Sequence, residues 1–312
     1  MKRINTYFKS LSPPPKRQKP DTSLPPSTTS TTWHEGYPFP IPDLPGDISD
    51  ALSEGCGLTP PKTITNHPHL DLLYFQPLIP GNTARELFLF LREELPFYRV
   101  KYTIRRGTQE TSITTPRFTT VFGVDETSRF SSEVDTSVSS AKLVDFKTNN
   151  VIPSTKYKCT PRPIPNCLRP LLDLVTRLTG MDYNFILVNY YATGDDSISY
   201  HSDDERFLGP DPTIASLSLG GKRDFLLKHK PGVQAGPLKF PLASGDMVVM
   251  RGETQKNWLH SVPKRKEAGG RINITFRKAL VPGGTENYYR YNVGDGGVWR
   301  WKSDVGEMAA VE

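Results

Sequence analysis

The sequence is poor in cysteine and contains no long apolar run. Only three cysteines occur among 312 residues (Cys56, Cys159 and Cys167), and their spacing fits neither a zinc site nor a disulfide framework. No apolar run approaches the roughly 20 residues that a membrane-spanning helix needs. The first residues, MKRINTYFKS, lack the apolar core of a secretory signal. These absences favour a reduced intracellular compartment and a protein without membrane association.

Apolar residues are also scarce, and the scarcity is concentrated at one end. The hydrophobic share is 36%, and 29 residues are prolines. Residues 1–65 contain SPPPKRQKP, SLPPSTTSTT and YPFPIPDLPGD, which have little periodic hydrophobicity. We therefore expect a disordered tail over residues 1–65 and one folded domain over residues 66–312.

The positive charge lies in the same tail. The formal net charge is +6, but residues 1–20 hold six basic side chains and no acidic one. Taking those six from the 39 basic residues leaves 33, which face 33 acidic ones. A nucleic-acid surface on the folded domain must therefore be a local patch.

Two short signals occur in the tail. PPPKRQKP resembles a small nuclear-import cluster, which predicts a nuclear location. Ile4, Tyr7 and Phe8 resemble the peptide that binds the DNA sliding clamp, although Met1 stands where that peptide usually has glutamine. The alternative is a tail that happens to begin with an apolar cluster.

The remaining chain predicts a mainly β fold with flanking helices. Helical spacing runs through residues 83–95 and 167–180, and Gly180 marks the end of the second helix. From residue 183 onward, short β-rich runs alternate with turns, which indicates an antiparallel sandwich or barrel.

The most informative stretch of this β-rich part is YHSDDERF, residues 200–207. By itself, HxD in an acidic turn is common and is usually only solvated surface. A second histidine, His260, follows 59 residues after His201 in WLHSVP. His201, Asp203 and His260 are the residue types of a 2-His-1-carboxylate triad, which fills one face of Fe(II) and leaves positions open.

A polar strand follows 11 residues after His260. In RINITFR, a period of two puts Arg271, Asn273, Thr275 and Arg277 on one face and the apolar residues on the other. Such a strand can simply face water. Two arginines with an amide and a hydroxyl in one file also form a receptor for a dicarboxylic acid, because guanidinium groups pair with carboxylates.

Together, NYYATGDDSISYHSDDE, WLHSVP and RINITFR resemble the AlkB family of iron(II)- and 2-oxoglutarate-dependent dealkylases, most closely its eukaryotic nuclear DNA-repair members. The resemblance covers about residues 95–280. It implies a double-stranded β-helix (jelly-roll) core that binds Fe(2+) through His201, Asp203 and His260. It further implies that 2-oxoglutarate is held by Asn189, Tyr191, Arg271, Thr275 and Arg277, with Asn273 orienting it.

The resemblance also implies a substrate. It predicts oxidative demethylation of 1-methyladenine and 3-methylcytosine in DNA, with release of formaldehyde, succinate and carbon dioxide from a flipped base. Asp204 and Glu205 match positions that face this base, and carboxylates favour a cationic methylated base. The alternative is that the two acids only orient the loop.

Other substrate contacts are weaker expectations. Tyr157 is a candidate for stacking on the base, whereas Phe122 is expected in the core. Arg105, Arg106 and Arg117 are candidates for phosphate contacts. We expect a monomer that acts on alkylated DNA. Three alternatives are an RNA demethylase of the same family, a non-catalytic jelly-roll module that binds nucleic acid, and a peptide or small-molecule hydroxylase.

Overall fold

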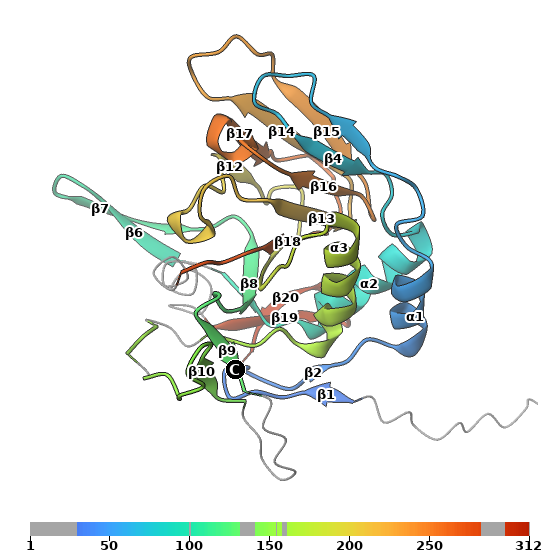
Figure 1. Ribbon diagram of the computed structural model, residues 1–312, viewed down its shortest axis with the longest axis vertical. Helices are drawn as coiled ribbons and strands as arrows, with labels where there is room; N and C mark the ends of the chain where they lie inside the picture. Colours follow the sequence, from blue (N-terminus) through green and yellow to red (C-terminus); the bar gives the residue numbers. More distant parts are fainter. Residues whose placement is uncertain are drawn as a thin grey trace, which may run out of the picture.

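Two antiparallel β-sheets face each other across an apolar core, and helices cover the outer side of the larger sheet (Figure 1). The computed structural model describes residues 30–99, 101–131, 141–153, 155–157, 161–281 and 297–311. Ten strands form the larger sheet, in the order β20 (Glu307–Ala310), β19 (Val298–Lys302), β5 (Phe97–Tyr98), β8 (Phe118–Gly123), β11 (Phe185–Tyr191), β18 (Arg271–Arg277), β13 (Ile214–Gly220), β16 (Met247–Met250), β4 (Leu72–Phe75) and β3 (Lys62–Ile64).

Four strands form the smaller sheet, in the order β12 (Ile198–His201), β17 (Trp258–Val262), β14 (Arg223–His229) and β15 (Leu238–Leu242). Leu187 and Val248 of the larger sheet share one apolar cluster with Leu227 and Trp258 of the smaller sheet. The two inner faces are therefore packed together, as in a β-sandwich. This arrangement confirms the predicted mainly β fold with a jelly-roll core and flanking helices.

Strand β18 lies in the middle of the larger sheet, between β11 and β13. All seven of its residues are buried, although every second one is polar. Ile272, Ile274 and Phe276 belong to the cluster under the helices, so Arg271 and Arg277 lie on the opposite face, between the sheets. The period-two prediction is confirmed, and the alternative that the polar face meets water is wrong.

Three helices pack on the outer side of the larger sheet: α1 (Gly46–Glu54), α2 (Gly81–Glu94) and α3 (Arg169–Thr179). Helices α2 and α3 confirm the two helices predicted from periodicity. Gly180 ends α3 with φ 67°, a left-handed conformation that glycine adopts readily. A fourth, short helix, α4 (Thr254–Asn257), leads directly into β17. No helix among the described residues is long and apolar enough to span a membrane.

The expectation of disorder up to residue 65 is wrong for residues 30–65. Strands β1 (Thr31–Thr32) and β2 (Ile41–Pro42) pair, and α1 places Ile48 and Leu52 in the core. The Tyr37 hydroxyl donates a hydrogen bond to the Pro163 carbonyl at 2.6 Å. A few well-spaced apolar residues therefore anchor a proline-rich segment that lacks a periodic pattern. The tail signals with Ile4, Tyr7 and Phe8 lie outside the described residues.

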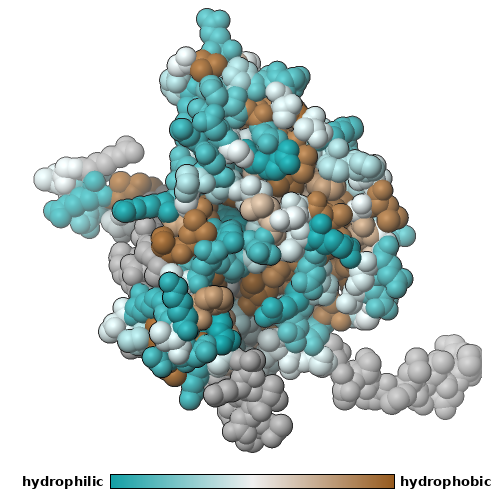
Figure 2. Space-filling model, viewed as in Figure 1, coloured by the Kyte–Doolittle hydropathy of each residue, from teal (hydrophilic) through white to brown (hydrophobic). Residues whose placement is uncertain are grey.

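Two further strand pairs lie outside the sandwich. Strands β6 (Lys101–Arg106) and β7 (Gln109–Thr114) form a hairpin that projects from the body of the protein (Figure 1), and its outer surface is mainly hydrophilic (Figure 2). Strands β9 (Ser128–Phe130) and β10 (Leu143–Asp145) form a smaller pair. The last two strands, β19 and β20, extend the larger sheet through the pairing of β19 with β5, an addition that strand patterning did not predict.

Candidate active site

His201, Asp203 and His260 lie together between the two sheets. The imidazoles of His201 and His260 face each other because the two residues are register partners on β12 and β17. The Nε2 atoms of His201 and His260 lie 3.7 Å from Oδ1 and Oδ2 of Asp203, respectively. One ligand atom from each of the three residues lies within 4.8 Å of the others. Among the described residues this is the only such cluster of metal-ligand side chains.

The protonation states of this cluster suit a metal ion. Burial lowers the pKa of His260 to about 3, so its imidazole is neutral at pH 7. Burial alone would raise the pKa of Asp203, but Arg277 and the two histidines outweigh it and lower that pKa. His201 Nδ1 lies 2.8 Å from the Ser199 carbonyl oxygen, which favours the tautomer with a free lone pair on Nε2.

The polar file of β18 runs inward from this cluster. Arg277 Nη2 lies 3.1 Å from Asp203 Oδ2, so Arg277 belongs to the cluster itself. Thr275 donates its hydroxyl to the Leu187 carbonyl at 3.1 Å. The Asn273 amide donates to Ser216 Oγ at 2.8 Å and to the Leu217 main-chain carbonyl at 3.0 Å, both on β13. The middle of the file is therefore fixed to its neighbouring strands.

Arg271 occupies the other end of the file and is only 1% exposed. One nitrogen, Nη2, donates to Ser218 Oγ at 2.8 Å. Within the described residues, no acceptor meets the buried Nε and Nη1 atoms. Burial lowers the pKa of Arg271 to about 10. A buried guanidinium with two unsatisfied donors is unfavourable alone and suits a carboxylate ligand.

Asn189 and Tyr191 of β11 complete this wall. They are the register partners of Asn273 and Arg271, so the predicted 2-oxoglutarate residues lie side by side. The Tyr191 ring lies between two guanidinium groups, at 5.4 Å from Arg271 and 5.6 Å from Arg223. Asn189, Tyr191, Arg271 and Asn273 line one pocket of about 1140 Å³ that also contains the three clustered ligands. A small dicarboxylic acid therefore fits between the His201–Asp203–His260 cluster and Arg271.

The two predicted damage readers have different positions. Glu205 lines the pocket, with Oε1 3.7 Å from Nη1 of Arg277. Asp204 is not among the residues that line it, and its Oδ2 accepts a hydrogen bond from Lys230 Nζ at 2.9 Å. In the described structure Asp204 therefore does not face the pocket, because its carboxylate pairs with a lysine outside it.

Tyr157 is not in the pocket either. It is buried, and its hydroxyl donates to Asp125 Oδ2 at 2.5 Å. This position does not suit the expected stacking role, because the hydroxyl is part of a buried polar network with Asp125 and Ser128. Phe122 is fully buried in the core, as expected.

The arginines predicted to contact phosphate lie in two places. Strand β6 ends with Arg105 and Arg106 near the tip of the hairpin, and Arg105 is not among the residues that line the pocket. The Nε atom of Arg105 lies 4.0 Å from a carboxylate oxygen of Glu110. Arg117 instead lines the pocket and donates from Nε to Asn189 Oδ1 at 3.0 Å.

Tyr200 and Arg206 are among the pocket-lining residues that sequence reasoning missed. Tyr200 is 42% exposed although it directly precedes His201. Its place next to the HxD run was the available signal. Arg206 follows the acidic run, and no pattern in the sequence distinguished it from a surface arginine.

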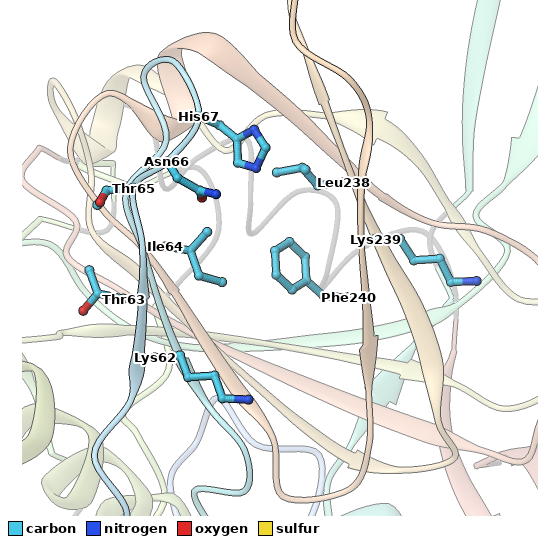
Figure 3. A pocket seen from close by; sticks show the side chains of 9 residues that line it. All are labelled: Lys62, Thr63, Ile64, Thr65, Asn66, His67, Leu238, Lys239 and Phe240. Atoms are coloured by element: carbon cyan, nitrogen blue, oxygen red, sulfur yellow. The ribbon is translucent and has the colours of Figure 1, made fainter.

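A second hollow, of about 540 Å³, lies between the edge strands β3 and β15. Figure 3 shows Ile64 and Phe240 facing each other across it. Its lining residues include no carboxylate, and Lys239 and Pro241 on β15 are typical protection for an exposed edge. The His201–Asp203–His260 cluster lies in the larger pocket, so the larger pocket is the candidate active site.

Comparisons with known proteins agree with this geometry. The family model of the 2OG-Fe(II) oxygenase superfamily matches residues 71–277. DNA oxidative demethylase ALKBH2 of Arabidopsis thaliana is 34% identical over 242 residues, covering 70% of this chain and 69% of that protein. Human DNA oxidative demethylase ALKBH2 is 40% identical over 129 residues, covering 39% of this chain and 49% of that protein.

The alpha-ketoglutarate-dependent dioxygenase alkB homolog 3 of Rattus norvegicus is 39% identical over 137 residues, covering 40% of this chain and 46% of that protein. The match thus spans about half the length of the human and rat relatives. A solved structure of OsALKBH1 aligns with 70% of this chain and 100% of its own, at 15% identity and a TM-score of 0.40. The chain belongs to the 2OG-Fe(II) oxygenase superfamily, whose cofactors are Fe(II) and 2-oxoglutarate, and within it to the AlkB family.

Proposed function

We propose that this protein oxidatively demethylates 1-methyladenine and 3-methylcytosine in DNA. The observation that carries the proposal is the single pocket that joins the His201–Asp203–His260 cluster to the unsatisfied guanidinium of Arg271. The names of the human and Arabidopsis relatives, both DNA oxidative demethylases, support DNA as the substrate.

In this proposal, His201, Asp203 and His260 hold Fe(II). Bound Fe(II), with 2-oxoglutarate and O₂, supplies the oxidation of the N-methyl group, and formaldehyde, succinate and carbon dioxide leave. Arg271, with Tyr191 beside it, binds one carboxylate of 2-oxoglutarate through its free Nε and Nη1 donors. Arg277 keeps Asp203 ionised and oriented.

The remaining polar residues orient the cosubstrate. Asn273 and Thr275 are anchored to neighbouring strands, so their side chains are preorganised walls of the pocket. Asn189 is held by Arg117 and faces the same cavity.

Glu205 is the proposed reader of the damaged base. Methylation at N1 of adenine or N3 of cytosine makes the base cationic at neutral pH, whereas the undamaged base is neutral. Glu205 is partly exposed in the pocket, so its carboxylate favours the cation. The exposed ring of Tyr200, next to His201, offers an apolar surface to a base that enters the pocket.

We further propose that the protein is a nuclear DNA-repair enzyme. The basic tail and the peptide around Ile4, Tyr7 and Phe8 support nuclear import and recruitment by the sliding clamp. We also propose that Arg105 and Arg106, at the end of strand β6 in the projecting β6–β7 hairpin, contact DNA phosphates.

The test is release of formaldehyde or succinate from a 1-methyladenine oligonucleotide in the presence of Fe(II) and 2-oxoglutarate. Wild type and Asp203→Ala are compared on matched DNA and RNA strands. We expect turnover on DNA that is lost in Asp203→Ala. Faster turnover on RNA would replace the proposal with RNA demethylation. No turnover on either strand by a folded, iron-loaded wild type would leave a non-catalytic binding module or a hydroxylase of a peptide or small molecule.

A further inference from the structure

The three clustered side chains are not equally fixed by the fold. His201 and His260 are paired across β12 and β17, so the smaller sheet sets their separation. Asp203 lies two residues past the end of β12, in a segment without regular secondary structure. A carboxylate there keeps its position only if other contacts hold its backbone.

Gln255 provides such a contact. Its Oε1 accepts a hydrogen bond from the backbone N–H of Asp203 at 2.9 Å, and its Nε2 donates to Met250 Sδ at 3.2 Å. Because the N–H can only donate and the thioether can only accept, these neighbours define the orientation of the amide. Gln255 is 1% exposed, so water cannot replace the bond to Asp203.

The position of Gln255 in the chain gives this bond a geometric consequence. Gln255 belongs to α4, which leads directly into β17 and therefore to His260. A side chain from the segment that carries one histidine thus binds the backbone of the segment that carries the carboxylate. The bond sets the separation between Asp203 and His260 whether or not a metal is bound.

Lys230 makes a second connection between the same segments. Its Nζ donates to Asp204 Oδ2 at 2.9 Å and to the Gln255 carbonyl oxygen at 3.3 Å. Its backbone N–H donates to the Asn257 carbonyl at 2.7 Å. Lys230 therefore links the residue after Asp203 to α4, which gives Asp204 a role outside the pocket.

We propose that Gln255 and Lys230 are positioning residues that hold the Asp203 loop, residues 202–205, in the geometry that binds the metal. Neither side chain is among those that line the active-site pocket, so both act through Asp203 and Asp204. The inference rests on the proposed function only in requiring that the cluster binds a divalent metal.

The first test compares Gln255→Met with Thr254→Val, using Mn(II) alone as the probe. Thr254 is an equally buried neighbour whose hydroxyl bonds the backbone of Asp71, away from the cluster. The Kd of Mn(II) is measured by electron paramagnetic resonance of the free ion, and Tm is measured without metal. We expect both variants to lose Tm, but only Gln255→Met to bind Mn(II) about 10- to 100-fold more weakly.

An unchanged Kd in Gln255→Met, or equal weakening in Thr254→Val, would overturn the positioning role. Lys230→Met tests the positioning role independently, even if Gln255→Met does not fold. Removing a positive charge near a cation site should by electrostatics alone tighten Mn(II) binding. The positioning role requires weaker binding, so a tighter or unchanged Kd refutes it for Lys230.

Comparing Mn(II) binding by the wild type and by His260→Ala separates failure of this inference from failure of the proposed function. If the wild type binds Mn(II) no better than His260→Ala, the metal site itself is wrong. If the wild type binds and both positioning variants bind equally well, only the inference fails.

Discussion

Replacing Arg271 with methionine should separate binding of 2-oxoglutarate from folding. In the ligand-free protein, burial lowers the pKa of Arg271 from 12.5 to about 10, which corresponds to about 3 kcal/mol against the charged form. Methionine removes that penalty. It also removes the hydrogen bond to Ser218, about 1.5 kcal/mol, and the contact with the Tyr191 ring, about 1 kcal/mol. The gain and the losses nearly cancel, so the free energy of unfolding should change by no more than about 1 kcal/mol.

The affinity for 2-oxoglutarate should respond very differently. The free Nε and Nη1 donors can each give a charge-assisted hydrogen bond worth at least about 1.5 kcal/mol. Their loss predicts a Kd for 2-oxoglutarate that is about 100-fold higher in Arg271→Met. The measurements are urea denaturation without ligand and titration of the Mn(II)-loaded protein with 2-oxoglutarate in the absence of oxygen.

Arg162 is the matched control. It is equally buried, but its terminal nitrogens donate to the Tyr98 hydroxyl, Thr120 Oγ1 and the Val121 carbonyl, and it does not line the pocket. Arg162→Met should therefore lower the free energy of unfolding by about 3 kcal/mol or more and leave the Kd for 2-oxoglutarate unchanged. A similar loss of stability in Arg271→Met, or an unchanged Kd there, would refute the assignment of Arg271 as a carboxylate receptor.

Three further predictions concern single residues. Glu205→Gln should lower the preference for cationic 1-methyladenine over neutral 1-methylguanine by about 10-fold in kcat/KM, whereas Asp204→Asn should leave that ratio unchanged because Asp204 lies outside the pocket. Tyr157→Phe should reduce the free energy of unfolding by about 1–3 kcal/mol in denaturant titrations without changing kcat/KM, since its hydroxyl bonds buried Asp125. Without metal, stability should fall as pH drops from about 6.5 toward 4, because the unfolded chain protonates His260 near 6.5 and the folded chain only near 3. A denaturation series in which His260→Gln keeps the wild-type pH slope would contradict this last prediction.

Regular strands explain which site residues were predictable. On β18 the side chains alternate strictly, so the file from Arg271 to Arg277 followed from period two alone. Asn189 and Tyr191 on β11, which the family resemblance implied, meet that file in register. The two histidines also lie on strands that pair with each other. Where the backbone is a central strand, the sequence pattern determines which side chains share the cavity.

The residues whose positions differ from expectation lie in segments without the two-residue period of a strand. Asp204 and Tyr157 occupy irregular segments, in which neighbouring side chains have no fixed alternation of direction. Residues 30–65 were missed for another reason. Their few apolar residues, such as Ile41, Ile48 and Leu52, are too widely spaced to give a strong pattern, yet each is buried against the helices.

The acidic run after His201 illustrates both cases within four residues. His201 ends a strand, so its direction follows from its pairing with His260. Asp203 turns inward only because its backbone is bound by Gln255 and its carboxylate by Arg277. Asp204 then points to Lys230, outside the pocket. The chemistry of the site therefore depends on residues 26 to 74 positions away along the chain, whose contribution no local motif could reveal.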